Sequence, residues 1–294
     1  MPFVENQGAK IYWDEQGQGA PILLIMGLGY ASCMWHRARP TLAQQYRTLA
    51  FDNRGVGLSD VPPGPYSIAT MAADAAGVLD AADVASAHVF GVSMGGMIAQ
   101  EFALQFPART RSLILGCTSP GGSSAIRAES KVIDILLGRG MTPEQARTAI
   151  LPYIYDASTQ QALIDEDVNL RRNWLPSPEG YTAQLQAIRA WGAYSRIAQI
   201  TAPTLVIHGR SDGLIPAGNG ELIARRIPGA SLVVLEHAGH MFLTDQTVRA
   251  MKEILAFLSS RQDRELAPPT QDSAPQHLRA TPGDIPGGHI SSSK

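Results

Sequence analysis

The sequence predicts an α/β fold, in which helices cover both faces of a mostly parallel sheet. Short runs rich in leucine and β-branched residues recur along the chain, and most are followed within two residues by Gly, Asp or Ser, as buried parallel strands commonly are. Segments with small and apolar residues at helical spacing separate these runs, which is the alternation that βαβ units produce. The expected strands lie at 21–25, 48–51, 88–91, 112–115, 204–207 and 232–235.

The elements around these strands follow from the same patterns. An antiparallel strand is expected over 9–15, at one edge of the sheet. One helix is expected over 71–82, and a second over 94–106, which ends before Pro107 because proline cannot continue the backbone hydrogen-bond ladder. Between residues 120 and 196 the strand-like runs stop, which predicts a helical insertion. Its helix-forming stretches include 133–137, 143–151 and 184–191.

The chain is therefore expected to divide into four segments. Residues 1–119 and 199–263 form the two parts of an α/β core, and residues 120–198 form a helical cap. The segment 264–294 is rich in Pro, Gly, Ser and polar residues and contains no aromatic residue, which predicts a disordered tail.

Composition excludes several classes of protein. The 294 residues include 24 Lys and Arg against 26 Asp and Glu, whereas a nucleic-acid binder normally has a basic excess. A hydrophobic content of 45% is enough for a large core. No apolar run approaches the roughly 18 residues that span a bilayer, and the first residues do not resemble a signal peptide. We expect a cytoplasmic protein that binds neither nucleic acid nor a membrane, with its oligomeric state left open.

The strongest chemical motif is Gly91-Val92-Ser93-Met94-Gly95, which fits the pattern G-x-S-x-G. It follows a predicted strand and opens a predicted helix, the setting of a nucleophile elbow. A sharp strand-to-helix turn needs glycines where side chains would clash, and the helix N-terminus offers free N–H groups to a developing negative charge. The motif predicts that Ser93 is a catalytic nucleophile rather than a simple turn serine.

A serine hydroxyl needs an adjacent base, which is most often a histidine. His237 and His240 follow the last predicted strand, where a loop can bring an imidazole over the nucleophile. We assign the base to His240, because Gly239 before it allows a tight turn, and leave His237 as a loop residue. The pair could also bind a metal, but no third ligand accompanies it, and Cys33 and Cys117 have no metal-type spacing. We therefore predict no metal.

The acid that orients the base should lie between Ser93 and His240 in the chain. Of the two strand ends in that interval, 116–121 contains no carboxylate, whereas 208–216 contains Asp212. The sequence therefore predicts Asp212 as the acid. The alternative is a turn-forming aspartate beside Gly213.

Two backbone N–H groups are needed to stabilise an oxyanion. The residue after the nucleophile, Met94, should supply one of them, and the loop after the strand at 21–25 should supply the other from Leu28, with Gly27 next to the substrate. The insertion is enriched in aromatic residues. Trp174 and Trp191 are candidates for the wall of an apolar pocket, although a cap also needs a core of its own.

Together with Asp52-Asn53-Arg54-Gly55-Val56-Gly57-Leu58-Ser59, these motifs resemble the α/β-hydrolase fold family over about residues 9–258. Within the family, the chain is similar to small carboxylesterases, aclacinomycin methylesterases and 3-oxoadipate enol-lactonases. The resemblance implies a mostly parallel central sheet flanked by helices, with a helical cap inserted after strand 6. It also implies a structural role for the stretch that begins at Asp52. Met26 stands where His-Gly is common in the family, which leaves the substrate open.

The activity that the resemblance implies is cofactor-free acyl transfer to water, with Ser93 attacking a carbonyl and His240 taking its proton. We expect a serine esterase or lactonase acting on a small or medium apolar substrate. Dehalogenases and epoxide hydrolases of this fold use aspartate at the elbow, so Ser93 argues against both. A carbon–carbon bond hydrolase of ring-cleavage products and a hydrolase-like ligand receptor remain as alternatives.

Overall fold

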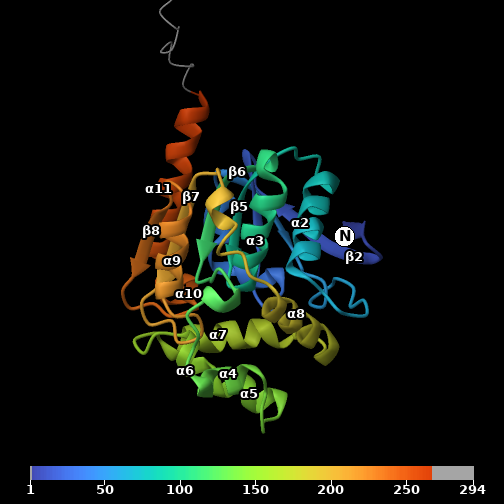
Figure 1. Ribbon diagram of the computed structural model, residues 1–294, viewed down its shortest axis with the longest axis vertical. Coiled ribbons are helices and arrows are strands. Elements are labelled where there is room, and N and C mark those ends of the chain that lie inside the picture. Colours follow the sequence, from blue (N-terminus) through green and yellow to red (C-terminus); the bar gives the residue numbers. More distant parts are fainter. Residues whose placement is uncertain (1, 267–294) are drawn as a thin grey trace, which may run out of the picture.

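The computed structural model describes residues 2–266, which form one sheet with helices on both of its faces (Figure 1). Within these residues the sheet has eight strands in the order β1-β2-β4-β3-β5-β6-β7-β8. Every strand from β4 to β8 pairs in parallel with its neighbour in that order. The strands are β1 (Phe3–Asn6), β2 (Ala9–Gln16), β3 (Ala20–Ile25), β4 (Tyr46–Phe51), β5 (Ala87–Val92), β6 (Thr110–Gly116), β7 (Thr204–Gly209) and β8 (Ser231–Leu235).

All six predicted parallel strands are present, and the strand predicted over 9–15 is β2. However, β2 does not form the edge of the sheet, because it runs antiparallel to both β1 and β4. The edge is β1, whose four residues are exposed or half-buried in alternation. So short and so little buried a strand produces no strong apolar run in the sequence.

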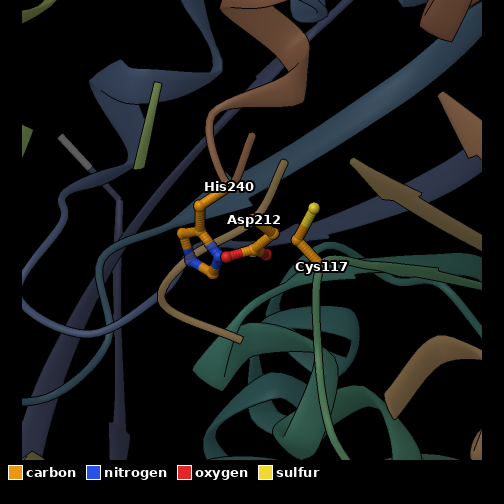
Figure 2. Close-up of side chains that lie close together, drawn as sticks. All are labelled: Cys117, Asp212 and His240. Carbon is orange, nitrogen blue, oxygen red and sulfur yellow. Dashed lines mark hydrogen bonds and ion pairs between the residues drawn. The ribbon is translucent and has the colours of Figure 1, made fainter. Parts of the chain in front are cut away.

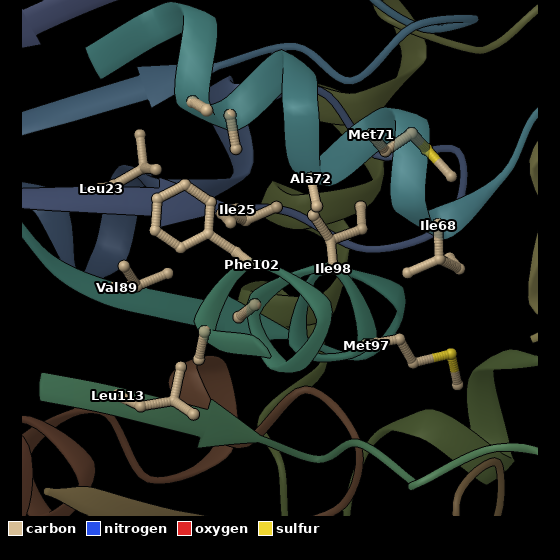
Figure 3. Packing of buried hydrophobic residues seen from close by; sticks show 14 of the residues in the cluster. Leu23, Ile25, Ile68, Met71, Ala72, Val89, Met97, Ile98, Phe102 and Leu113 are labelled. Carbon is tan, nitrogen blue, oxygen red and sulfur yellow. The ribbon is translucent and has the colours of Figure 1, made fainter. Parts of the chain in front are cut away.

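The strands are apolar on both faces because helices cover both faces. Figure 3 shows one side, where strand residues such as Leu23, Val89 and Leu113 pack against Ile98 and Phe102. That face is covered by α2 (Ile68–Ala81), α3 (Met94–Gln105) and α9 (Gly218–Arg226). Alternate residues of the same strands point to the opposite face, which is covered by η1 (Ser32–Arg37), α1 (Arg39–Leu42), α10 (Phe242–Asp245) and α11 (Thr247–Leu266). The remaining short helices are η2 (Pro107–Arg109), η3 (Gly122–Ser124) and η4 (Ile197–Gln199).

Between β6 and β7 the chain forms the predicted helical cap, which Figure 1 shows at one end of the sheet. The part of the chain described there contains α4 (Ser130–Leu136), α5 (Pro143–Ala149), α6 (Leu151–Ile154), α7 (Gln161–Arg172) and α8 (Pro178–Ala190). Val132, Ile135, Ile150, Ile154 and Tyr155 form a small buried cluster of the cap's own. The sequence pattern does not reveal α7, in which only Asp167 is buried, because the helix's charged composition obscures its apolar spacing.

The C-terminal helix α11 continues to Leu266, so its end overlaps the segment 264–294 for which the sequence predicted disorder. The rest of that segment lies outside the described residues. Among the helices of residues 2–266, none combines the length and the apolar character that a bilayer crossing requires.

Candidate active site

Ser93 lies at the turn between β5 and α3, with φ 57° and ψ −123°. A positive φ is unfavourable for a residue with a Cβ atom and costs about 1–3 kcal/mol, so the surroundings must hold it in place. The Ser93 N–H donates to the Gly116 carbonyl at 2.9 Å, and the Thr118 hydroxyl donates to the Ser93 carbonyl at 2.7 Å. Both partners lie on or just after β6, so the neighbouring strand fixes the conformation of this turn.

The glycines of the motif are required by close packing. A Cβ at Gly91 would overlap the Gly95 carbonyl, and a Cβ at Gly95 would overlap the Ile25 carbonyl. A Cβ at Gly96 would lie 2.6 Å from the Cβ of Thr118. The pattern G-x-S-x-G therefore reflects how closely the start of α3 approaches β3 and β5.

Asp212 and His240 come from the loops after β7 and β8, and Figure 2 shows their side chains facing each other. The Nδ1 atom of His240 lies 2.8 Å from Oδ2 of Asp212. The other carboxylate oxygen accepts the backbone N–H groups of Leu214 and Ile215, at 2.9 and 2.8 Å. The turn that forms around Asp212 thus fixes one oxygen and leaves the other for the imidazole.

His208 is a second, buried histidine beside the Asp212 carboxylate. Its Nε2 lies 3.3 Å from Oδ2 of Asp212 and 2.8 Å from the Ile215 carbonyl. Burial alone would raise the pKa of Asp212, but His240 and His208 outweigh it and hold that pKa at about 2. The carboxylate is therefore ionised at neutral pH, and it favours a proton on Nδ1 of His240, which leaves Nε2 as an acceptor.

The loop that carries His240 is tightly packed at Gly239. The Gly239 N–H donates to the Asp245 carboxylate at 2.7 Å, and a Cβ at this position would lie 2.7 Å from the Ile154 carbonyl of the cap. A glycine before the histidine is therefore needed because the cap backbone approaches this position so closely. His237 is exposed and is not one of the residues that line the cavity described next.

Ser93 and His240 line the same cavity, which lies between the core and the cap and has a volume of about 1080 Å³. Within the described residues, the Ser93 hydroxyl and the His240 imidazole are not hydrogen-bonded to each other. Such contacts are often long in unliganded enzymes and shorten when substrate binds.

Gly27, Leu28 and Met94 also line this cavity. A Cβ at Gly27 would lie 3.0 Å from the Cβ and 3.4 Å from Oγ of Ser93, so the loop after β3 runs directly beside the serine. In the part of the chain that the structure describes, neither the Leu28 N–H nor the Met94 N–H donates a hydrogen bond. Two backbone donors are thus available near Ser93.

Gln184 holds this loop from the cap, a contact that the sequence analysis missed. It is a buried residue of α8, and its side chain accepts the Gly29 N–H at 2.8 Å and donates to the Arg54 carbonyl at 2.8 Å. No local pattern distinguishes Gln184 from other polar helix residues, because its partners lie 130 or more positions away in the chain.

The two tryptophans predicted to contact substrate are not residues of the cavity wall. Trp191 is buried, and its indole N–H donates to the Glu101 carboxylate on α3 at 2.8 Å, so it anchors the cap to the core. Trp174 is half-buried just beyond α7. The assignment of both residues to substrate binding is therefore corrected. Aliphatic and methionine side chains form most of the wall, among them Met97, Leu136, Ile150, Leu185, Leu214 and Met241.

Cys117 lies beside the pair in Figure 2, and the donor atoms of Cys117, Asp212 and His240 all fall within 4.8 Å of one another. A metal would need the thiolate. Burial, followed by the nearby Asp212 carboxylate, raises the pKa of the Cys117 thiol well above its usual value. The chemistry of this group therefore favours a neutral thiol packed behind the histidine–aspartate pair over a metal centre.

Comparisons with known proteins agree with this architecture. The family model for the alpha/beta hydrolase fold matches residues 20–145 and 155–247. The chain is 32% identical to the "Putative carbamate hydrolase RutD" of Azorhizobium caulinodans, over 82% of this chain and 92% of that protein. It is 31% identical to a poly(3-hydroxyalkanoate) depolymerase of Ectopseudomonas oleovorans, over 85% of this chain and 88% of that protein.

A crystal structure of the enol-lactonase from Burkholderia xenovorans is also similar. Its TM-score is 0.80 at 26% identity, and the match covers 88% of this chain and 100% of that chain. Both the sequence and the arrangement of strands and helices thus lead to one conclusion. The protein is a member of the alpha/beta hydrolase fold family.

Proposed function

We propose that this protein is a serine hydrolase that cleaves a carboxylic ester or a lactone through an acyl-enzyme on Ser93. The observation that carries the proposal is the shared cavity. Ser93, the His240 imidazole paired with Asp212, and the unpaired N–H groups of Leu28 and Met94 all border it. A nucleophile, an oriented base and an oxyanion site in one cavity are the parts that acyl transfer needs.

The reaction would proceed in two halves. In the first, Oγ of Ser93 attacks the substrate carbonyl carbon while Nε2 of His240 takes the hydroxyl proton. The ionised Asp212 stabilises the resulting imidazolium, and the Leu28 and Met94 N–H groups stabilise the oxyanion. When the tetrahedral intermediate collapses, the bond to the alkoxy oxygen breaks and that oxygen takes the proton from His240.

In the second half, His240 takes a proton from water, and the hydroxide oxygen attacks the acyl carbon. Collapse releases the carboxylic acid and returns a proton to Oγ of Ser93. In an ester the alcohol departs after the first half, whereas in a lactone it remains attached to the acyl group. The same residues serve both substrates.

The cavity supports a largely apolar substrate, and it has room for one of medium size. Its volume of about 1080 Å³ lies near the upper end of ordinary ligand sites, and aliphatic and methionine side chains form most of its wall. The names of related proteins, which include a polyester depolymerase and an enol-lactonase, agree with ester or lactone chemistry.

The first experiment is p-nitrophenol release from the acetate, butyrate, octanoate and laurate esters by the wild-type protein and by Ser93→Ala. We expect a rate that depends on Ser93 and a chain-length optimum that reflects the cavity. Ser124→Ala is the matched control, because Ser124 is exposed and does not line the cavity. It should retain the wild-type rate.

If no ester is hydrolysed, fluorophosphonate labelling shows whether the nucleophile is inactive or the esters tested are unsuitable substrates. Labelling of the wild type that is lost in Ser93→Ala supports an active nucleophile even where the four esters fail. Full ester hydrolysis by Ser93→Ala would overturn the proposal. So would turnover of a ring-cleavage dienoate by a protein that hydrolyses neither esters nor lactones.

A further inference from the structure

The wall of the cavity that contains Ser93 carries positive charge only. Among the described residues that line it there are arginines but no aspartate or glutamate. An apolar cavity that accepted only neutral substrates would have no need of this charge, because burying an arginine without a partner is unfavourable. The arginines are Arg37, Arg127, Arg139, Arg147, Arg171 and Arg189.

Most of these arginines have another explanation. Arg37 is ion-paired with Asp167 at 2.9 Å, and Arg139 with Asp134 at 2.8 Å. Arg127 and Arg189 are exposed. The two that remain, Arg147 on α5 and Arg171 on α7, are half-buried and form no ion pair with any residue in the described part of the chain.

Arg171 is held in a fixed position by Tyr30. The guanidinium carbon lies 3.8 Å from the centre of the Tyr30 ring, and Nη1 donates to the Tyr30 hydroxyl at 3.1 Å. The Nε atom of Arg171 is buried and has no hydrogen-bond partner among the described residues. The Arg171 guanidinium therefore borders the cavity with no acidic partner within residues 2–266, and a carboxylate is the acceptor that matches its planar fork of N–H donors.

The nearest acidic residue on the same helix does not fill this role. Asp167 lies one turn before Arg171, but its Oδ1 is paired with His36 at 3.2 Å and with Arg37. Its Oδ2 accepts the Tyr155 hydroxyl at 3.0 Å and the Thr244 hydroxyl at 2.6 Å. The Asp167 carboxylate is therefore fully engaged elsewhere.

Tyr30 also connects Arg171 to the reacting end of the cavity. The Tyr30 N–H donates to the Gly27 carbonyl at 3.2 Å, and Gly27 packs directly against Ser93. The loop that would supply an oxyanion donor from Leu28 thus also supports the arginine. A substrate bound with its carbonyl at Ser93 could extend toward Arg171 within the same cavity.

We propose that Arg171 binds a carboxylate of the substrate, so that the natural ester or lactone carries a negatively charged group at some distance from the scissile bond. This inference rests on the proposed function, since it names the substrate class of the same site. It assigns Arg171 to specificity and Tyr30 to positioning Arg171.

The test compares anionic and neutral esters of equal length. The anionic substrates are the mono-p-nitrophenyl esters of the six- and eight-carbon linear dicarboxylic acids, and the neutral ones are p-nitrophenyl hexanoate and octanoate. The readout is the ratio of kcat/KM for the anionic ester to kcat/KM for the neutral ester. We expect at least one pair to give a wild-type ratio of about 10 or more, as a charge-assisted hydrogen-bonded pair would produce.

Arg171→Gln should lower this ratio by about tenfold or more, and Arg171→Lys should lower it less, because lysine keeps the charge but loses the planar fork. Arg172→Gln is the matched control. It removes the same charge from the next position of α7, but Arg172 is exposed and does not line the cavity, so the ratio should stay within about twofold of wild type. An equal fall in Arg171→Gln and Arg172→Gln would overturn the inference.

A variant that gains a new substrate preference shows that a change in the ratio is not caused by misfolding. Arg171→Glu should raise kcat/KM, relative to the neutral ester, for a p-nitrophenyl ester whose acyl chain ends in a trimethylammonium group. Failure to gain this preference in a folded variant counts against the inference. If the wild type hydrolyses the neutral esters through Ser93 but shows no preference for the anionic ones, the inference fails and the proposed function stands. If it hydrolyses neither class and is not labelled at Ser93, both fail.

Discussion

The imidazole of His240 and the carboxylate of Asp212 are joined by a 2.8 Å contact between Nδ1 and Oδ2, although they lie 28 positions apart in the chain. The adjacent strands β7 and β8 bring the two loops together, and backbone N–H groups of Leu214 and Ile215 hold the carboxylate. This arrangement binds the Nδ1 edge of the imidazole and leaves Nε2 directed away from the acid. The first two predictions follow from it.

Asp212→Asn should lower kcat for p-nitrophenyl butyrate by about 10³- to 10⁴-fold, because an amide cannot stabilise the imidazolium and can favour the wrong tautomer. KM should change little, since the carboxylate is buried behind His240. Asp134→Asn is the control, because that aspartate lies on the exposed side of α4. A loss of less than about tenfold in a folded Asp212→Asn protein would contradict the role of the pair.

The same pair should make stability depend on pH in the acid range. The pKa of Asp212 is held at about 2 in the folded protein, below its usual value, so its ionised form contributes stability above about pH 4. That contribution is lost as the pH falls toward 2 and should amount to about 2 kcal/mol. Urea unfolding of wild type and Asp212→Asn at pH 6 and pH 3 measures it. The difference between the two proteins should shrink at pH 3, and a constant difference would contradict the prediction.

Two glycine substitutions should have opposite effects on stability. Gly95→Ala would place a Cβ on the Ile25 carbonyl and should destabilise the protein by several kcal/mol or prevent folding. Gly77→Ala, inside α2, would place its Cβ 3.6 Å from Val4, which is an ordinary contact. Because alanine favours helix, that variant should gain about 0.5–1 kcal/mol. Equal unfolding free energies for the two variants, measured in urea, would show that the packing argument at Gly95 is wrong.

The buried carboxylate of Asp167 should be a major support of the cap. It connects α7 to Arg37 on η1 and accepts hydroxyl groups from Tyr155 and Thr244. Asp167→Asn removes the buried negative charge that pairs with Arg37. The substitution should lower the unfolding free energy by about 3 kcal/mol. Glu166→Gln removes the exposed partner of the same arginine and should cost less than about 1 kcal/mol. If Asp167→Asn lowered the unfolding free energy by less than Glu166→Gln, the result would contradict this role of Asp167.

The sequence alone determined the features that depend on neighbouring residues or on the order of elements. The strands from β3 to β7 contain continuous apolar runs because the sheet is buried there on both faces, so local composition reveals them. The motif around Ser93 is recognisable because the positions where a Cβ would clash all fall within a few residues of the serine, and each of them is a glycine. Asp212 and His240 could be assigned because parallel strands place their carboxyl ends at one edge of the sheet.

Only the tertiary structure decided which cap residues face the cavity. Trp191 and Arg171 both belong to helices or loops of the cap, and nothing in their local sequence indicates that one packs against Glu101 while the other lies on Tyr30. The Arg171–Tyr30 contact spans 141 positions, and its geometry depends on how α7 docks against the loop after β3. The physical reason is that a side chain's direction in a helical insertion is set by packing between segments distant in the chain, whereas the turn at Ser93 carries its glycines within one short motif.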